Sequence, residues 1–170
     1  IKMNRIIRED IRTVVDNCAF IKQRLNGKSI LITGATGMLL SYMVYTLEYL
    51  TDIDSDFKVT VYIGVRDIEK AKRRFGAFLD ESFVHIFNAD LNKSFDFTEH
   101  TDFIIHGASL ASSDMYLKTP VEVILPNIFG TYNLLELARR EKCEGFLFFS
   151  SGAIYGKVVD CNIITERDSG

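Results

Sequence analysis

The chain has 170 residues, enough for one α/β domain with a full hydrophobic core, and 47% of them are hydrophobic and 25% charged, as in globular proteins. Its net charge of −3 gives no basic field for nucleic acid, no apolar stretch has the length of a membrane span, and the three cysteines are too widely spaced for a zinc site or a disulfide framework. We therefore expect one domain in a reducing, cytoplasmic compartment, with no metal, nucleic-acid or membrane partner.

The first part of the chain has the spacing of one helical face. Apolar residues recur at positions 7, 11, 14, 15, 18, 21 and 25, and Asn26-Gly27 is a helix stop. We expect a leading helix over residues 4–25, packed on the domain, so that residues 1–27 form an amino-terminal addition to it.

A short apolar run then breaks into a glycine turn and an amphipathic helix. Ile30-Leu31-Ile32 lacks polar alternation, which is typical of a strand buried on both faces of a parallel sheet. Gly34 allows a sharp turn, and Gly37 allows backbone to approach a ligand, so N–H groups at the start of the helix, residues 37–50, could meet a pyrophosphate. A plain strand-to-helix turn is the alternative.

The remaining pattern continues this alternation of strands and helices. After a polar loop at 51–56, strands are expected at 57–65, 83–87, 103–105 and 146–149, and helices at 68–79 and 121–141. Asp67 is placed to cap the first of these helices, and Pro126 predicts a kink or irregular turn in the second. The order predicts an α/β fold with a Rossmann-like, doubly wound parallel sheet in three αβα layers.

Small and polar residues follow each expected strand. These groups are Thr33-Gly34-Ala35-Thr36-Gly37, Arg66-Asp67, Asn88-Ala89-Asp90-Leu91, His106-Gly107-Ala108-Ser109 and Ser150-Ser151-Gly152. The carboxyl ends of parallel strands meet at one rim, where a dinucleotide would lie. We expect His106 to be a packing residue rather than a general base, because such histidines are more often structural.

Five motifs follow one another along the chain: TGATGMLL at 33–40, the Asp90-Leu91 pair, HGAS at 106–109, Pro126-Asn127 and FFSSGAIYG at 148–156. In this order they resemble those of the extended short-chain dehydrogenase/reductase family, the nucleotide-sugar epimerases and dehydratases. The resemblance covers residues 28–170, which we expect to be an NAD(P)-binding Rossmann domain. It implies hydride transfer between the nicotinamide and a sugar carbon, with a nucleotide sugar as substrate.

The resemblance also implies a role for each matched segment. Residues expected around the pyrophosphate are Gly34, Ala35, Thr36, Gly37, Met38 and Leu39. Those expected beside the adenine are Asp90 and Leu91, and those on the path to the nicotinamide ribose are Gly107, Ala108 and Ser109. Ser151 matches the family's catalytic serine or threonine, which hydrogen-bonds the reacting sugar hydroxyl or carbonyl.

Three positions differ from the family pattern. Leu40 stands where a glycine lets helix and strand pack closely, so we expect the helix to lie slightly further out. Arg66 follows Val65 in place of the acid that holds the ribose hydroxyls, which favours NADP over NAD. Gly152-Ala153 replaces the acidic residues of the dehydratases, which favours an epimerase or reductase.

The family's Tyr-x-x-x-Lys pair has no match in residues 156–170, which contain no tyrosine. We therefore expect an amino-terminal fragment that binds cofactor without turning over, and that exposes apolar residues of the helix at 121–141, with a homodimer as one outcome. A non-catalytic NAD(P)-binding sensor and a reductase of a non-sugar carbonyl remain the alternatives.

Overall fold

A five-stranded parallel sheet forms the centre of the protein. The computed structural model describes residues 4–76, 82–93, 96–109, 113–156 and 164–168. The strands are β1 (Lys28–Thr33), β2 (Val59–Val65), β3 (Val84–Asn88), β4 (Phe103–His106) and β5 (Gly145–Phe148). Their order is β3-β2-β1-β4-β5, and every neighbouring pair is parallel. This is the doubly wound sheet that the sequence predicts.

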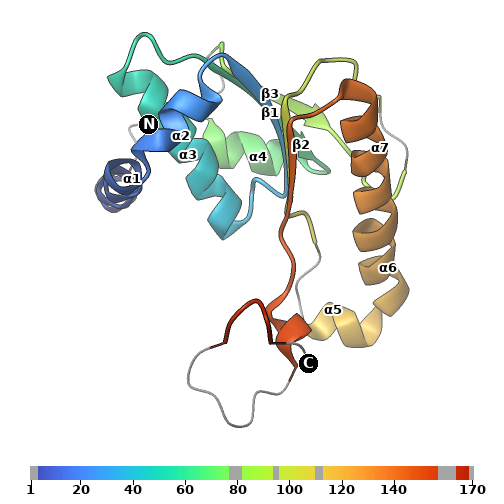
Figure 1. Cartoon of the computed structure of the whole chain (residues 1–170). Coiled ribbons are helices and arrows are strands. Elements are labelled where there is room, and N and C mark those ends of the chain that lie inside the picture. The colour runs from blue at the N-terminus through green and yellow to red at the C-terminus, as the bar shows by residue number, and fades with distance from the viewer. Residues whose placement is uncertain (1–3, 77–81, 94–95, 110–112, 157–163, 169–170) are drawn as a thin grey trace.

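Helices cover both faces of the sheet (Figure 1). Helices α3 (Met38–Ile53) and α4 (Ile68–Phe75) lie on one face, and α7 (Thr131–Glu141) lies on the other. Alternate residues of β1 serve the two cores, because Ile30 and Ile32 pack with the α3 side and Leu31 packs with Leu134 and Leu137 of α7. The expected three αβα layers are confirmed.

The expected single leading helix over 4–25 is wrong, because it is two helices, α1 (Arg5–Asn17) and α2 (Ala19–Leu25). The break is at Cys18, whose N–H bonds the Val15 carbonyl. Helix α1 packs on α3, and Ile21 and Leu25 of α2 pack against the same core. Ile11 of α1 is completely buried in that core, and α2 leads into β1.

Other bounds differ from the prediction, most of them by a single residue. Helix α3 continues to Ile53, so part of the expected polar loop is helical, and the backbone N–H of Asp54 bonds the Leu50 carbonyl at the helix end. Strand β2 begins later than expected, because the backbone of Lys58 bonds to Asn26 and Gly27 instead of a neighbouring strand. The predicted helix at 68–79 is described as α4 as far as Phe75, and residues 77–79 lie outside the described residues.

The expected long helix at 121–141 is irregular at Pro126, as the sequence predicts. It consists of α6 (Pro120–Leu125), a π-helical turn η1 (Pro126–Gly130) and α7. Proline has no backbone N–H to donate, and π-turns accommodate such an interruption within a helix. A further short helix, α5 (Ser113–Lys118), precedes α6 and was not predicted.

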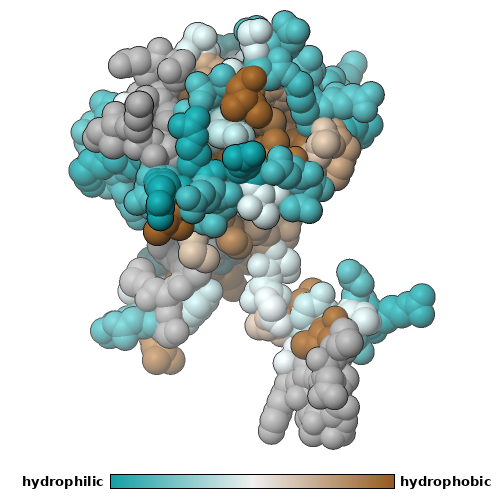
Figure 2. Space-filling model, turned by 90° about the vertical axis from the view of Figure 1, so that its left-hand side faces the viewer, coloured by the Kyte–Doolittle hydropathy of each residue, from teal (hydrophilic) through white to brown (hydrophobic). Residues whose placement is uncertain are grey.

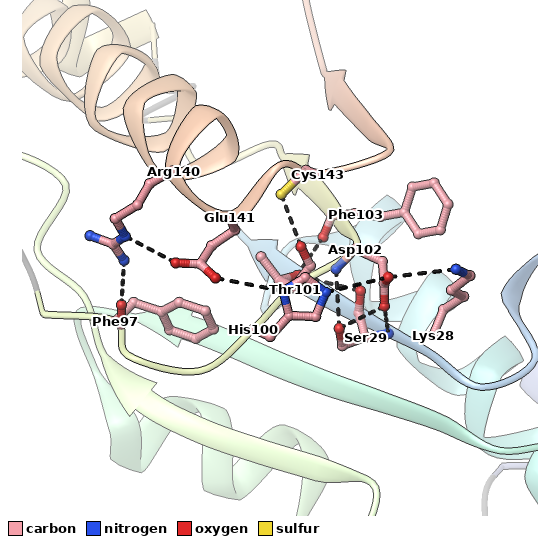
Figure 3. A network of polar contacts seen from close by, with 10 residues as sticks. All are labelled: Lys28, Ser29, Phe97, His100, Thr101, Asp102, Phe103, Arg140, Glu141 and Cys143. Carbon is pink, nitrogen blue, oxygen red and sulfur yellow. Dashed lines mark hydrogen bonds and ion pairs between the residues drawn. The ribbon is translucent and has the colours of Figure 1, made fainter.

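A polar network joins the starts of β1 and β4 to the end of α7 (Figure 3). The Asp102 carboxylate accepts hydrogen bonds from the Ser29 backbone N–H at 2.8 Å and the Ser29 hydroxyl at 2.9 Å. His100 Nε2 lies 3.5 Å from Asp102 Oδ1, and His100 Nδ1 lies 3.6 Å from Glu141 Oε2. Lys28 Nζ lies 3.6 Å from Asp102 Oδ1. The network therefore lies at the amino ends of the strands, here called the amino edge of the sheet, opposite their carboxyl ends.

Candidate functional site

A cleft of about 450 Å³ lies at the carboxyl ends of the strands. The predicted site residues that line it are Gly34, Thr36, Gly37, Arg66, Asp90, Leu91, Gly107, Ala108 and Ser109. The segments after β1 and β4 both contribute, and between these strands the order of the sheet reverses, which is where open parallel sheets bind ligands. The structure thus brings four separate stretches of sequence to one place.

The glycine turn after β1 fits tightly against the end of β4. Gly34 has φ +82°, and a Cβ added to it would lie 2.6 Å from backbone atoms of Gly107 and Ala108. Gly37 is exposed and precedes α3 without a side-chain cap, which leaves the N–H groups of the first turn for an anionic ligand. At Gly34 and Gly37 the turn therefore presents backbone without a side chain to a group in the cleft.

The other three residues predicted around the pyrophosphate, Ala35, Met38 and Leu39, do not line the cleft. Ala35 is completely buried, and Met38 and Leu39 are exposed on the first turn of α3 without lining the cleft. Their side chains therefore do not form its walls. Any contact from Met38 or Leu39 would come from the backbone N–H groups of that first turn.

Leu40 is accommodated by a second glycine. Its side chain is 4% exposed, and its Cδ1 atom lies 2.5 Å from where a Cβ on Gly107 would be. The bulk that the sequence has at Leu40 is thus matched by the absence of a side chain at Gly107. This pairing brings the start of α3 against the residue that follows β4, although the turn has no third glycine.

Two cations lie together where β2 ends. Arg66 and Lys70 both line the cleft and are exposed, and neither has an ion-pair partner within the described part of the chain. Asp67 between them caps α4, with its carboxylate accepting from the Lys70 backbone N–H at 2.8 Å. Sequence reasoning missed Lys70. Its signal was a cation in the first turn of a helix, where the helix dipole disfavours positive charge.

The ends of β3 and β4 complete the cleft. The Asp90 carboxylate accepts from the Asn92 backbone N–H at 3.1 Å and lies 3.8 Å from the Lys93 ammonium. Leu91 is buried against Gly130, where an added Cβ would lie 2.8 Å from the Leu91 Cβ. Leu91 thus connects the cleft to the π-turn, whose Pro126 also lines it.

His106 is a buried packing residue, as expected. It is 1% exposed, its Nδ1 lies 2.8 Å from the Thr33 hydroxyl, and its Nε2 lies 3.1 Å from the Thr131 hydroxyl. Burial lowers the pKa of His106, so the ring is neutral at pH 7. It does not line the cleft, and neither do Thr33 and Thr131, its two hydrogen-bond partners.

Ser151, the predicted catalytic residue, does not line the cleft. It is exposed, and its hydroxyl accepts from the Ala153 backbone N–H at 3.2 Å at the start of a 3₁₀ turn, η2 (Gly152–Tyr155).

No helix among the described segments is long and apolar enough to cross a membrane. The described residues also contain no cluster of three or more His, Cys, Asp or Glu side chains that could hold a metal ion.

Comparison with known proteins gives consistent matches. The model of the NAD dependent epimerase/dehydratase family matches residues 30–169. Over 144 residues the chain is 26% identical to a human dTDP-D-glucose 4,6-dehydratase, covering 78% of this chain and 38% of that protein. It is 31% identical over 143 residues to UDP-glucuronate 4-epimerase 6 of Arabidopsis thaliana, covering 79% of this chain and 30% of that protein.

Solved structures agree on the fold. A structure titled Pen from Bacillus thuringiensis superposes with a TM-score of 0.65 at 24% identity, covering 78% of this chain and 40% of that one. A UDP-glucose-4-epimerase from Stenotrophomonas maltophila superposes with a TM-score of 0.62 at 19% identity, covering 84% of this chain and 43% of that one. The chain thus spans well under half the length of these proteins. On the match to residues 30–169, the chain belongs to the NAD-dependent epimerase/dehydratase family.

Proposed function

We propose that residues 28–170 are the NAD(P)-binding part of a nucleotide-sugar epimerase or dehydratase that works by hydride transfer at a sugar carbon. The observation that carries this proposal is the cleft at the sheet reversal, walled by the glycine turn and the end of β4. The relatives support it, since they include dTDP-glucose dehydratases and UDP-sugar epimerases, and the Stenotrophomonas epimerase structure holds NAD.

The residues present fit a dinucleotide. The backbone of Gly34 to Gly37 and the first turn of α3 would hold the pyrophosphate, with Met38 and Leu39 contributing only N–H groups. Asp90 and Leu91 would border the adenine, and Gly107, Ala108 and Ser109 would lie along the path to the nicotinamide ribose. The cofactor itself supplies the hydride chemistry, and the protein supplies binding and orientation.

Arg66 and Lys70 favour NADP. A 2′-phosphate carries up to two negative charges, and two cations without ion-pair partners among the described residues stand where β2 ends, beside the position of the adenosine ribose in such folds. Asp67, the acid nearest to them, already accepts the Lys70 backbone N–H. It is therefore a poorer partner for ribose hydroxyls than a free carboxylate would be.

For the chemistry, we propose that Ser151 hydrogen-bonds the reacting sugar hydroxyl or carbonyl in the whole protein. Gly152-Ala153 beside it supplies neither acid nor base, which favours epimerisation or reduction over the elimination of water. Residues 28–170 include no Tyr-x-x-x-Lys pair after Ser151, so binding without turnover is expected of them alone.

Calorimetric titration with NADP and NAD tests the binding proposal. We expect both to bind and Gly37→Val to abolish binding, because a branched side chain would fill the space over the helix start. Gly152→Val is the matched control, since a Cβ there meets nothing within 4 Å. Lack of binding at millimolar cofactor, or equal binding by the Gly37 variant, would contradict the proposal.

A further inference from the structure

Behind the cleft, four residues form one continuous chain of hydrogen bonds. The Thr33 hydroxyl lies 2.8 Å from His106 Nδ1, and His106 Nε2 lies 3.1 Å from the Thr131 hydroxyl. That hydroxyl in turn donates to the Asn127 backbone carbonyl at 2.6 Å. The chain thus connects the end of β1, the end of β4, the first residue of α7 and the π-turn.

The proton positions along this chain follow from the donor count. A threonine hydroxyl has one hydrogen, and Thr131 donates it to the Asn127 carbonyl, so Thr131 must accept from His106 Nε2. Nε2 therefore carries the ring proton of a neutral His106. Nδ1 is then the acceptor for the Thr33 hydroxyl. All three hydrogen bonds run in one direction, from Thr33 to Asn127.

We propose that His106 is a positioning residue for the glycine turn, fixing the end of β1 relative to β4 and α7 through this chain of hydrogen bonds. Thr33 directly precedes Gly34 and lies opposite His106 in the strand register. Its carbonyl also accepts from the Gly107 backbone N–H at 3.1 Å. Side chain and backbone of Thr33 thus both bind to β4.

The fit at Gly34 makes this link matter for the cleft. The turn passes so close to Gly107 and Ala108 that no Cβ fits, and both of those residues line the cleft with Gly34. A shift of Thr33 would therefore change the width of the cleft between the turn and the end of β4. His106 touches neither the cleft nor its contents, so it acts through Thr33. For cofactor affinity, this inference rests on the proposed function.

Two substitutions of His106 test the two hydrogen bonds of its ring separately. An asparagine amide oxygen can replace Nδ1 as acceptor for Thr33, and a glutamine amide nitrogen can replace Nε2 as donor to Thr131. We expect His106→Asn to stay within about threefold of wild-type NADP affinity and His106→Gln to lose about tenfold, because the Thr33 link sets the turn. Thr33→Val should lose about as much NADP affinity as His106→Gln. Thr33→Ser keeps the hydroxyl and should retain wild-type affinity.

The deciding experiment records ¹⁵N-histidine and backbone amide NMR spectra of the chain without cofactor, so that it stands whether or not NADP binds. We expect the Nε2–H tautomer at His106, and shifts of the Gly34 and Gly37 amide signals in Thr33→Val that Thr33→Ser reverses. An Nδ1–H or doubly protonated ring at pH 7 would overturn the inference. Unmoved glycine amides in Thr33→Val and His106→Gln would do so as well. Absence of NADP binding by wild type would count against the proposed function alone.

Discussion

Two glycines of this chain have similar left-handed backbone angles but different surroundings. Gly27 has φ +76° with nothing within 4 Å of an added Cβ, and Gly34 has φ +82° with backbone of β4 at 2.6 Å. The first glycine lies in the turn into β1, where its N–H bonds the Lys58 carbonyl. The second also permits the close approach of β1 to the end of β4, on which the cleft depends.

Alanine at these two positions measures the two effects separately. Gly27→Ala should lower the free energy of unfolding by about 1–2 kcal/mol, the cost of left-handed backbone. Gly34→Ala should lower it by a further ~1–3 kcal/mol, because the methyl group also overlaps Gly107 and Ala108. Urea denaturation of both variants checks this. Equal losses would show that the two strand ends are not in close contact.

The pairing of Leu40 with Gly107 predicts non-additive substitutions. Gly107→Ala should lower the free energy of unfolding by about 1–3 kcal/mol through overpacking, and Leu40→Ala should lower it by about 2–4 kcal/mol through the cavity left behind. In the double variant the new methyl fills part of that cavity, so the loss should be smaller than the sum. Strict additivity in the same denaturation series would contradict the contact.

At the level of elements, apolar runs and the glycine, proline and polar residues between them were enough to predict most of the fold. The strands were predictable because each is a short apolar run followed by small or polar residues, and the irregular turn at Pro126 because proline lacks an N–H. The break at Cys18 was not predictable, since the apolar spacing continues through it. The cluster of Arg66 with Lys70 and the fit of Leu40 to Gly107 were missed because each depends on tertiary contacts.

Asp102 is expected to be the main acid of the amino-edge network. Burial alone would raise the pKa of Asp102, but the hydrogen bonds from Ser29 and the charge of Lys28 outweigh it, and the net shift is downward. A lowered pKa in the folded state contributes stability above the ordinary value near 3.8, which is lost as the pH falls through the folded value.

Asp102→Asn should therefore lower the free energy of unfolding at pH 7 by about 1–3 kcal/mol. The variant should also lose less stability than wild type between pH 4 and pH 2. Asp52→Asn is the control, because its exposed pair with Arg8 is worth about 0–1 kcal/mol. Thermal or urea unfolding across this pH range gives both values, and parallel pH curves for Asp102→Asn and wild type would contradict the assignment.

At the scale of the whole molecule, the two outer sides differ. The side that carries α1 and α2 is hydrophilic over most of the face seen in Figure 2. Helices α6 and α7 and the π-turn instead expose a row of large apolar side chains. The row consists of Val121, Ile124, Ile128, Phe129, Tyr132 and Leu135, each 48–59% exposed. Contiguous apolar surface of this kind is typical of protein–protein contacts.

We propose that the chain self-associates through this row. Light scattering over a concentration series should show dimers, and Ile128→Glu should weaken the association by at least about tenfold, because a charge would be buried in the contact. Ile6→Glu, which changes an equally exposed isoleucine on α1, should leave it unaltered. A monomer at the highest concentration reached would contradict the proposal.

The most direct measurement is an NMR titration that follows backbone amide signals while NADP is added. Binding in the cleft predicts that signals of the glycine turn, the end of β2 and the end of β4 move together, those of Gly37, Arg66 and Gly107 among them. Signals of the amino edge, such as Lys28 and Asp102, should stay unchanged. No movement at millimolar NADP, or movement confined to the amino edge, would contradict a cofactor site at the carboxyl ends of the strands.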